Sequence, residues 1–201
     1  MHNTRKITDD LTFLGVNDRR IALFENVFPV SRGVSYNSYL LKDEKTVLLD
    51  TVDKSAHDQF LENLAYALDG RKLDYLVVNH MEPDHAATIQ DVVEKYPEVK
   101  IVCNAKTQTM LKQFFSFDVD TDTMIIKEGD VLETGKLERT IVANQKYENI
   151  IEKKRTKGGD NTVEFYQLTD SELYVAVLQP VVRRGSRCPV VVIPLGGPNI
   201  E

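Results

Sequence analysis

A cluster of polar side chains between a strand and a helix constrains the fold of this chain most. The apolar run Tyr75-Leu76-Val77-Val78 has the length and composition of a buried strand, and apolar residues recur at helical spacing after Ala86. Between them, the six positions from His80 to His85 hold two imidazoles and two carboxylates. Ligands of α/β sheets gather at the carboxyl ends of the strands. We therefore expect this stretch to lie at such an edge and to bind a ligand.

The spacing within the stretch predicts metal binding. His80 and Glu82 are two positions apart, so their side chains leave an extended segment on the same side. Pro83 disfavours helical backbone at Glu82 and helps to keep that segment extended. Asp84 and His85 then point elsewhere, so the stretch offers His80 with Glu82 to one metal ion and Asp84 with His85 to a second. Imidazole with carboxylate suits iron, manganese or zinc, and a carboxylate-rich set favours the harder ions.

A simpler interpretation of the same residues needs no metal. Asp84 would cap the helix that follows, and His80 and His85 would be ordinary loop histidines. Asp50, which ends a predicted strand, would bond loop amides. His57, in the first turn of another predicted helix, would be a solvated histidine.

The residues Asn79 to Ala86, NHMEPDHA, resemble the metal-binding signature of flavodiiron proteins, a branch of the metallo-β-lactamase-like fold. Hydrolases of that fold usually carry His where this chain has Glu82, so the resemblance points to the iron-dependent, redox-active branch. Similarity to the family extends roughly over residues 3 to 135, through three further segments: Asn37–Leu40, Thr46–Thr51 and Ala105–Thr107.

The resemblance carries further implications. It implies an α/β fold, the N-terminal part of a metallo-β-lactamase-like αββα layered fold, with reduction of dioxygen or nitric oxide as the activity. It also implies a di-iron cofactor, FMN supplied by another domain or chain, an electron-donor protein or flavin domain as partner, and a homo-oligomer. The family's site uses a histidine, a bridging aspartate and a final histidine from later in the domain. This chain has four histidines and none after His85, so we expect an incomplete site.

The balance of charged residues changes near the position where the resemblance ends. Residues 1–136 carry 16 Lys and Arg against 23 Asp and Glu, whereas residues 137–201 carry 9 against 8. We therefore expect an incomplete flavodiiron-type domain over residues 1–136 and a β-rich tail of unrecognised origin over residues 137–201. The tail's two basic clusters, Lys153–Lys157 and Arg183–Arg187, are typical of solvated loops.

The bulk properties exclude several functional classes. A net charge of −6 argues against non-specific binding of nucleic acid. No apolar run approaches membrane-spanning length, and the N-terminus lacks the apolar core of a signal peptide. Only two cysteines are present, Cys103 and Cys188, which fits the reducing cytoplasm better than a disulfide framework. Cys103 lies in a predicted strand and is expected to be a small core residue.

Strands that alternate with helices predict the layered α/β fold. A helix should begin at Ser55, with Asp58 as its capping-box partner, and should end at Gly70. A second helix should end before Pro97. A third should span 107–115, with four apolar side chains facing inward: Met110, Leu111, Phe114 and Phe115. The predicted strand pairs are 11–15 with 20–24, 37–41 with 46–50, 123–127 with 131–133, and the hairpin 162–168 with 173–178. Single strands are predicted at 73–78, 99–103, 189–194 and at the start of 140–152.

Three functions follow from these observations. The first is a flavodiiron-type oxidoreductase, or a piece of one that carries half of the di-iron site. The second is a non-catalytic module for stability or association on a degenerate form of the same fold. The third, a zinc hydrolase, is disfavoured by Glu82 and by the missing downstream histidines.

Overall fold

The computed structural model describes residues 2–24, 27–79, 81–127 and 130–135, together with the backbone of four later strands at 140–144, 162–169, 172–177 and 191–193. The predicted basic clusters of the tail lie outside the described residues. In the part of the chain that is described, no helix has the length and apolar character needed to cross a membrane.

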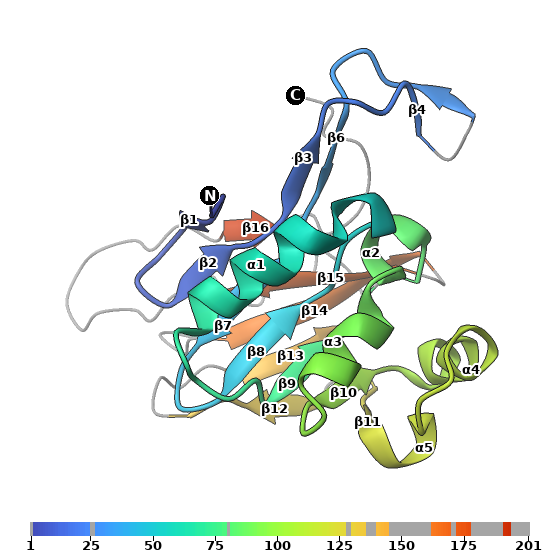
Figure 1. Ribbon diagram of the computed structural model, residues 1–201. Coiled ribbons are helices and arrows are strands. Elements are labelled where there is room, and N and C mark those ends of the chain that lie inside the picture. Colours follow the sequence, from blue (N-terminus) through green and yellow to red (C-terminus); the bar gives the residue numbers. More distant parts are fainter. Residues whose placement is uncertain are drawn as a thin grey trace.

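A mixed sheet of seven strands forms the centre of the molecule (Figure 1). Its order is β1 (Arg5–Lys6), β2 (Leu11–Phe13), β7 (Tyr39–Lys42), β8 (Thr46–Leu49), β9 (Tyr75–Val77), β10 (Lys100–Cys103) and β11 (Thr123–Ile125). The pairs β1–β2, β2–β7 and β7–β8 are antiparallel, and β8 to β11 run parallel to one another. The parallel half brings the carboxyl ends of β8, β9 and β10 to one edge.

Both faces of this sheet are buried. Leu48, Leu76 and Ile101 belong to the core on one face, and Val47 and Val77 belong to the core on the other. Central strands that are covered on both faces read as continuous apolar runs, which is how the sequence of β8 reads. Cys103 is 1% exposed, and burial raises the pKa of its thiol to about 12, so it is the small core residue that we predicted.

Helices cover one face of the sheet (Figure 1). They are η1 (Lys54–Ala56), α1 (His57–Leu68), α2 (Pro83–Ala86), α3 (Ile89–Lys95), α4 (Ala105–Phe114) and α5 (Val119–Asp122). Phe60 and Leu64 of α1 and Val92 of α3 lie in the same buried cluster as the sheet residues beneath them. This layer confirms the predicted α/β class.

The start of the first helix differs from the prediction. Asp53, not Ser55, is the N-cap, and its carboxylate accepts the N–H of Ser55 at the beginning of η1. The helix ends as predicted, since Asp69 and Gly70 adopt the left-handed conformation that terminates a helix. Phe114 of α4 was wrongly predicted to face inward, because its side chain is 66% exposed.

A second sheet contains five strands in the order β12 (Val131–Glu133), β13 (Thr140–Asn144), β14 (Thr162–Thr169), β15 (Glu172–Val177) and β16 (Val191–Ile193). The predicted hairpin is confirmed as the antiparallel pair β14–β15. The predicted pairing of 123–127 with 131–133 is wrong, because β11 joins β10 in the first sheet and β12 joins β13 in the second. Leu132 of β12 packs into the core on the second face of the central sheet.

An arm projects from the body beside the beginning of α1 (Figure 1). Its stem is the antiparallel pair β3 (Val16–Asp18) and β6 (Val34–Tyr36), and its tip is the pair β4 (Leu23–Phe24) and β5 (Phe28–Pro29). The predicted hairpin of 11–15 with 20–24 is therefore wrong. Asn17 and Asp18, which are turn-prone residues, lie in a strand that pairs with a partner later in the chain.

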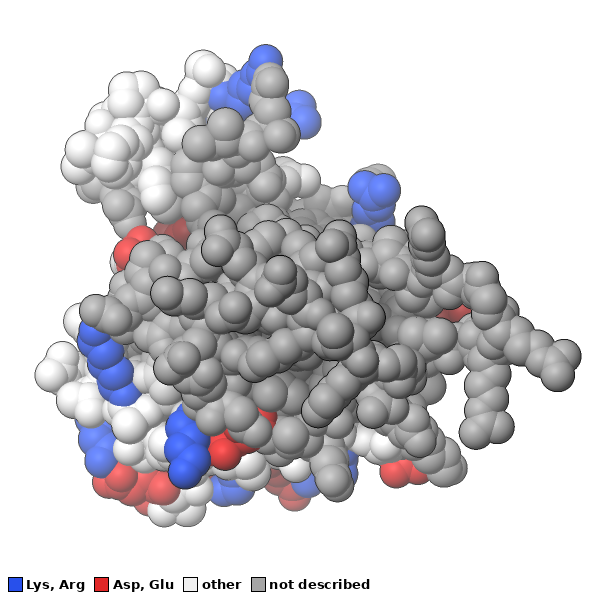
Figure 2. Space-filling view, turned by 180° about the vertical axis from the view of Figure 1, so that it is seen from behind, with Lys and Arg blue, Asp and Glu red and all other residues white. Residues whose placement is uncertain are grey.

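Charges of both signs lie close together on the surface opposite the helices. In Figure 2, blue Lys and Arg side chains alternate with red Asp and Glu side chains along the described lower edge of this face. Ion pairs among the described residues include Lys72 with Glu98 and Lys112 with Asp120, at 2.8 and 2.5 Å.

Candidate metal centre

The predicted metal-binding stretch lies at the carboxyl edge of the parallel strands, as the sequence predicts. Asp50 follows β8 directly, and Asn79 comes two residues after the end of β9. The N–H of Asn79 donates to Oδ1 of Asp50 at 2.7 Å, which ties the ends of the two strands together. This bond confirms the expectation that Asp50 bonds a loop amide.

Asp50 holds a conformation that is uncommon for a residue with a side chain. Its φ is +53°, in the left-handed region, and the residue is only 1% exposed. The backbone is fixed on both sides, since its N–H donates to the carbonyl of Val77 at 2.9 Å and its carbonyl accepts the hydroxyl of Ser38 at 2.9 Å. The left-handed turn directs the chain out of the sheet into the loop before η1 and keeps the carboxylate at the edge.

Helix α2 carries two of the predicted ligands into the same edge. Glu82 is its N-cap residue and Pro83 its first residue, which places Asp84 and His85 within the first turn. Asp84 and His85 are buried, at 8% and 1% exposure, whereas Glu82 is exposed. The simpler interpretation is wrong for both residues, because Asp84 is not the cap and His85 lies in a helix rather than a loop.

Thr51 anchors α2 to the end of β8. Its N–H and its hydroxyl both donate to the carbonyl of His85, at 3.0 and 2.7 Å. One turn further on, the hydroxyl of Thr88 accepts the N–H of Val52 and donates to its carbonyl, at 3.2 and 3.0 Å. These four bonds fix the position of the His85 backbone relative to Asp50.

The imidazole of His85 lies between two carboxylates. Its Nδ1 is 3.8 Å from Oδ2 of Asp50, and its Nε2 is 3.5 Å from Oδ2 of Asp84. A histidine that binds a metal through one ring nitrogen commonly has its other nitrogen directed at a carboxylate, which orients the ring. With Asp50 beside Nδ1, Nε2 is the nitrogen that lies on the side of the second predicted ligand, Asp84.

This geometry shows where three of the four predicted ligands lie and does not test metal binding. Asp84 and His85 are brought together, whereas Glu82 lies at the exposed beginning of α2. His80 lies outside the described residues. Among the residues that the structure describes, no group of three or more His, Cys, Asp and Glu side chains is arranged to hold a metal ion. Asp84 and His85 therefore fit iron by donor type and proximity as one part of a site, and the full set His80, Glu82, Asp84 and His85 stays a prediction.

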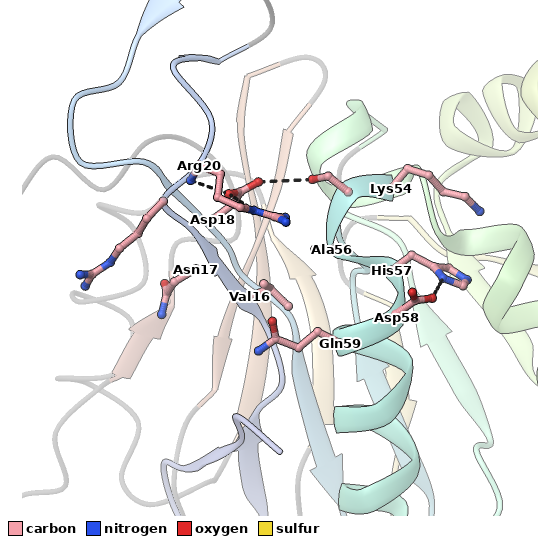
Figure 3. A pocket seen from close by; sticks show the side chains of 11 residues that line it. Val16, Asn17, Asp18, Arg20, Lys54, Ala56, His57, Asp58 and Gln59 are labelled. Carbon is pink, nitrogen blue, oxygen red and sulfur yellow. Dashed lines mark hydrogen bonds and ion pairs between the residues drawn. The ribbon is translucent and has the colours of Figure 1, made fainter. Parts of the chain in front are cut away.

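A pocket of about 610 Å³ lies beside this edge, between the arm and the first helix (Figure 3). One wall is β3 with the two arginines after it, and the other runs from Lys54 to Gln59. None of Asp50, Asp84 and His85 lines it. The pocket is therefore a neighbour of the predicted metal centre, not its binding cavity.

Asp18 lines the pocket from the side of β3. Burial raises the pKa of its carboxyl, but bonds from the backbone N–H and the guanidinium of Arg20 outweigh that effect and leave the pKa below its usual value. Its second oxygen accepts the hydroxyl of Ser55 at 3.5 Å. The carboxylate therefore joins the arm to the first turn of η1.

His57 differs from the solvated histidine that we expected. Its side chain is 28% exposed and lies between two carboxylates, with Nδ1 2.8 Å from Oδ1 of Asp58 and Nε2 3.2 Å from Oδ1 of Asp91. Lys54 also contacts both oxygens of Asp91 at 2.8 Å. These contacts connect the beginning of α1 to α3 and give His57 a structural role.

Sequence reasoning missed two residues of the site. Thr51 and Thr88 carry no motif, and their role depends on contacts between segments 34 and 36 residues apart. A pattern of spacing cannot reveal such contacts, because each threonine is compatible with many environments.

The mixed sheet, its helical layer and the carboxylate–histidine edge define a metallo-β-lactamase-like domain. A family model described as ODP family beta lactamase matches residues 34–147. The chain belongs to this family, and its relatives identify it as a member of the flavodiiron proteins.

The relatives are much longer than this chain. FprA2, a flavo-diiron protein of Clostridium acetobutylicum, is 32% identical over 130 residues, which cover 65% of this chain and 32% of the relative. A nitric oxide reductase of Moorella thermoacetica is 36% identical over 137 residues, or 68% and 34% of the two chains. The crystal structure of the flavodiiron protein from Giardia intestinalis superposes with a TM-score of 0.63 and 26% identity, and the match covers 68% of this chain and 33% of that one. This chain thus spans about a third of the length of the relatives that it matches.

Proposed function

We propose that this chain supplies half of a di-iron centre in a flavodiiron-type oxidoreductase that reduces dioxygen or nitric oxide. The observation that carries the proposal is the pair Asp84 and His85, buried at the carboxyl edge with Nε2 3.5 Å from the carboxylate. The carboxylate and the imidazole are kept out of bulk water, and the bonds from Thr51 to the carbonyl of His85 hold the backbone that carries them. Family membership supports iron as the metal.

The individual residues have separate tasks in this proposal. Asp84 and His85 bind one iron, and His80 and Glu82 bind the other. Asp50 faces Nδ1 of His85, and with a proton held on that nitrogen the lone pair of Nε2 is the one that binds the metal. Bound iron would supply one-electron redox chemistry. Burial of His85 and Asp50 at 1% exposure limits the access of water to this side of the centre.

The rest of the machinery is part of the same proposal. Other segments or chains supply the ligands that the family takes from later in its domain. They also supply an FMN group and an electron-donor protein or flavin domain. We also propose a boundary near residue 136, a homo-oligomer and a cytoplasmic location, the last supported by the presence of only two cysteines.

A non-catalytic module is the second candidate, and one observation favours it. Strand β13 lies within the match to the family model, and it pairs with β14, which lies beyond that match, so the later β-rich part of the chain shares a sheet with the family segment. A tail that replaces missing elements of the fold would serve stability or association. A zinc hydrolase remains disfavoured, because Glu82 stands where such enzymes usually carry His.

Metal content tests the three candidates. The purified chain is loaded with ferrous iron or zinc without oxygen, and the metal is measured by mass spectrometry together with the visible spectrum of the iron form. Iron retained in preference to zinc supports the oxidoreductase, zinc supports the hydrolase, and no metal supports the module. Because the chain offers few ligands to each ion, we expect a chelator to remove the iron readily during dialysis.

Variants locate the binding. His85→Asn should lower iron affinity by at least about tenfold, since even the loss of a residue that only supports a ligand costs about 10–100-fold. His57→Asn is the matched control, because His57 also lies between two carboxylates but away from the edge. Equal losses in both variants would show that the iron is not bound at α2.

Activity is expected only when the centre is complete. The 201-residue chain with iron and a chemical reductant should consume neither dioxygen nor nitric oxide faster than free iron does. Turnover by the chain alone, abolished by Glu82→Ala, would show that residues 137–201 complete the site.

A further inference from the structure

Asn79 is a buried residue whose side chain has no hydrogen-bond partner among the residues that the structure describes. The residue is 1% exposed, and within this described part both Oδ1 and Nδ2 of its carboxamide are buried without a partner. Its backbone N–H, in contrast, is bonded to Asp50 at 2.7 Å. Burying an amide without hydrogen bonds costs free energy, and native proteins rarely leave such groups unsatisfied without a functional reason.

A second asparagine in the same chain shows what a structural role looks like. Asn63 of α1 is 0% exposed, and both ends of its carboxamide are bonded. Nδ2 donates to the carbonyl of Leu14 at 3.0 Å, and Oδ1 accepts the N–H of Asn3 at 2.9 Å. The chain thus satisfies a buried asparagine fully where the residue only connects elements, and Asn79 differs from it.

The position of Asn79 indicates what its partner is. Asn79 directly precedes the predicted ligand His80, and it bonds to Asp50, whose other oxygen faces His85. Leu76 and Val78 belong to the core beneath the helices, and Val77 belongs to the core on the opposite face. Val77, two positions before Asn79, lies in the same core as Leu132 of β12, so Asn79 follows a strand that is covered on both faces.

We propose that Asn79 is a positioning residue of the metal centre, whose carboxamide hydrogen-bonds a water molecule in the coordination shell of the metal. The inference rests on the proposed function. An ion with few protein ligands keeps water in its remaining positions. A carboxamide offers two donors and an acceptor, so it can bond such a water and hold its orientation. Binding of the metal would then satisfy a group that the metal-free chain leaves without a partner.

Substitution by leucine tests the proposal in two measurements. Leucine has nearly the shape of asparagine and no polar atoms. Asn79→Leu should raise the melting temperature of the metal-free chain, by about 2–4 °C for a chain of this size, because an unsatisfied buried amide is removed. Asn63→Leu, the matched control, should lower the melting temperature, because it leaves the groups of Leu14 and Asn3 without their bonds.

The metal-bound measurements use ferrous iron and the whole chain. Asn79→Leu should weaken iron binding about tenfold and shift the visible spectrum of the iron form. In Asn63→Leu, affinity and spectrum should remain as in the unsubstituted chain. Asn79→Leu would then stabilise the metal-free chain and weaken iron binding. Replacement of a purely structural asparagine would not produce both effects.

Two outcomes overturn the proposal and are distinguishable from each other. If the unsubstituted chain binds iron and Asn79→Leu binds it equally well with the same spectrum, Asn79 does not contact the metal's shell and the proposed function stands. If the unsubstituted chain binds no iron, the proposed function and this inference both fail.

Discussion

Asp50 shows how one side chain connects the backbone of the sheet to the chemistry at its edge. Its left-handed backbone ends β8, one carboxylate oxygen bonds the N–H of Asn79, and the other faces His85. A buried carboxylate is costly unless it is bonded. The bond from the N–H of Asn79 therefore offsets part of the cost of burying the carboxylate of Asp50.

Two replacements of Asp50 test these contributions together. Asp50→Ala removes the acceptor of the Asn79 N–H and should lower the free energy of unfolding by about 1–3 kcal/mol. Asp50→Asn keeps an oxygen acceptor and tolerates the left-handed backbone, so its loss should be clearly smaller. Urea unfolding of the metal-free chain measures both. Equal losses would mean that the bond to Asn79 contributes nothing.

At the scale of elements, the arm depends on a close approach of two backbone segments. Gly33 has φ +80°, and a Cβ atom there would lie 2.1 Å from the carbonyl oxygen of Asp18. Gly70, which follows α1, has a similar φ of +77° but no atom within 4 Å of such a Cβ. The two glycines share a conformation and differ only in the space around them.

Alanine at these two positions should have different effects. Gly70→Ala bears only the left-handed backbone penalty of about 1–2 kcal/mol. Gly33→Ala bears the same penalty and also forces β3 and β6 apart, so it should lower the free energy of unfolding further and displace Asp18 from its contact with Ser55. Urea unfolding compares the two variants. A loss at Gly33 no greater than at Gly70 would contradict the close packing of the arm.

At the scale of the whole molecule, a strand of the second sheet contributes to the apolar core on one face of the first sheet. The core on that face contains Leu11, Leu41, Val47, Leu49, Val77, Val102 and Leu132. Leu132 comes from β12, and β12 is joined to the tail through β13. The tail is therefore connected by hydrogen bonds to the strand that contributes to this core.

Truncation after residue 136 tests this connection. Without β13, β12 becomes an unpaired edge and its hold on the core weakens. We expect a lower free energy of unfolding, since exposing each large apolar side chain costs about 1.5–3 kcal/mol, and we expect association that increases with concentration. Urea unfolding and light scattering of both chains provide the measurements. A truncated chain as stable and as monomeric as the whole one would make residues 137–201 a passive appendage.

The sequence by itself determined the local elements and the nature of the site. Apolar runs predicted β8, β9 and β10 within a residue or two, and alternation predicted the hairpin β14–β15. These predictions succeed because each depends on neighbours in the chain. The ligand-rich stretch before α2 was predicted for the same reason, since its chemistry and its strand–helix context lie within a dozen residues.

Only the tertiary structure decided the partners. The short strands β11 and β12 contain too few residues to specify a neighbour, and each pairs with a strand other than the one that we predicted. Asn17 and Asp18, predicted as a turn, lie in β3, which pairs with β6. Asp50 and His85 are 35 positions apart and meet because parallel strands end at one edge. The unsatisfied carboxamide of Asn79 is visible only once its surroundings are packed. Pairing and burial are properties of the whole assembly, because their free energies depend on groups that are distant in the chain.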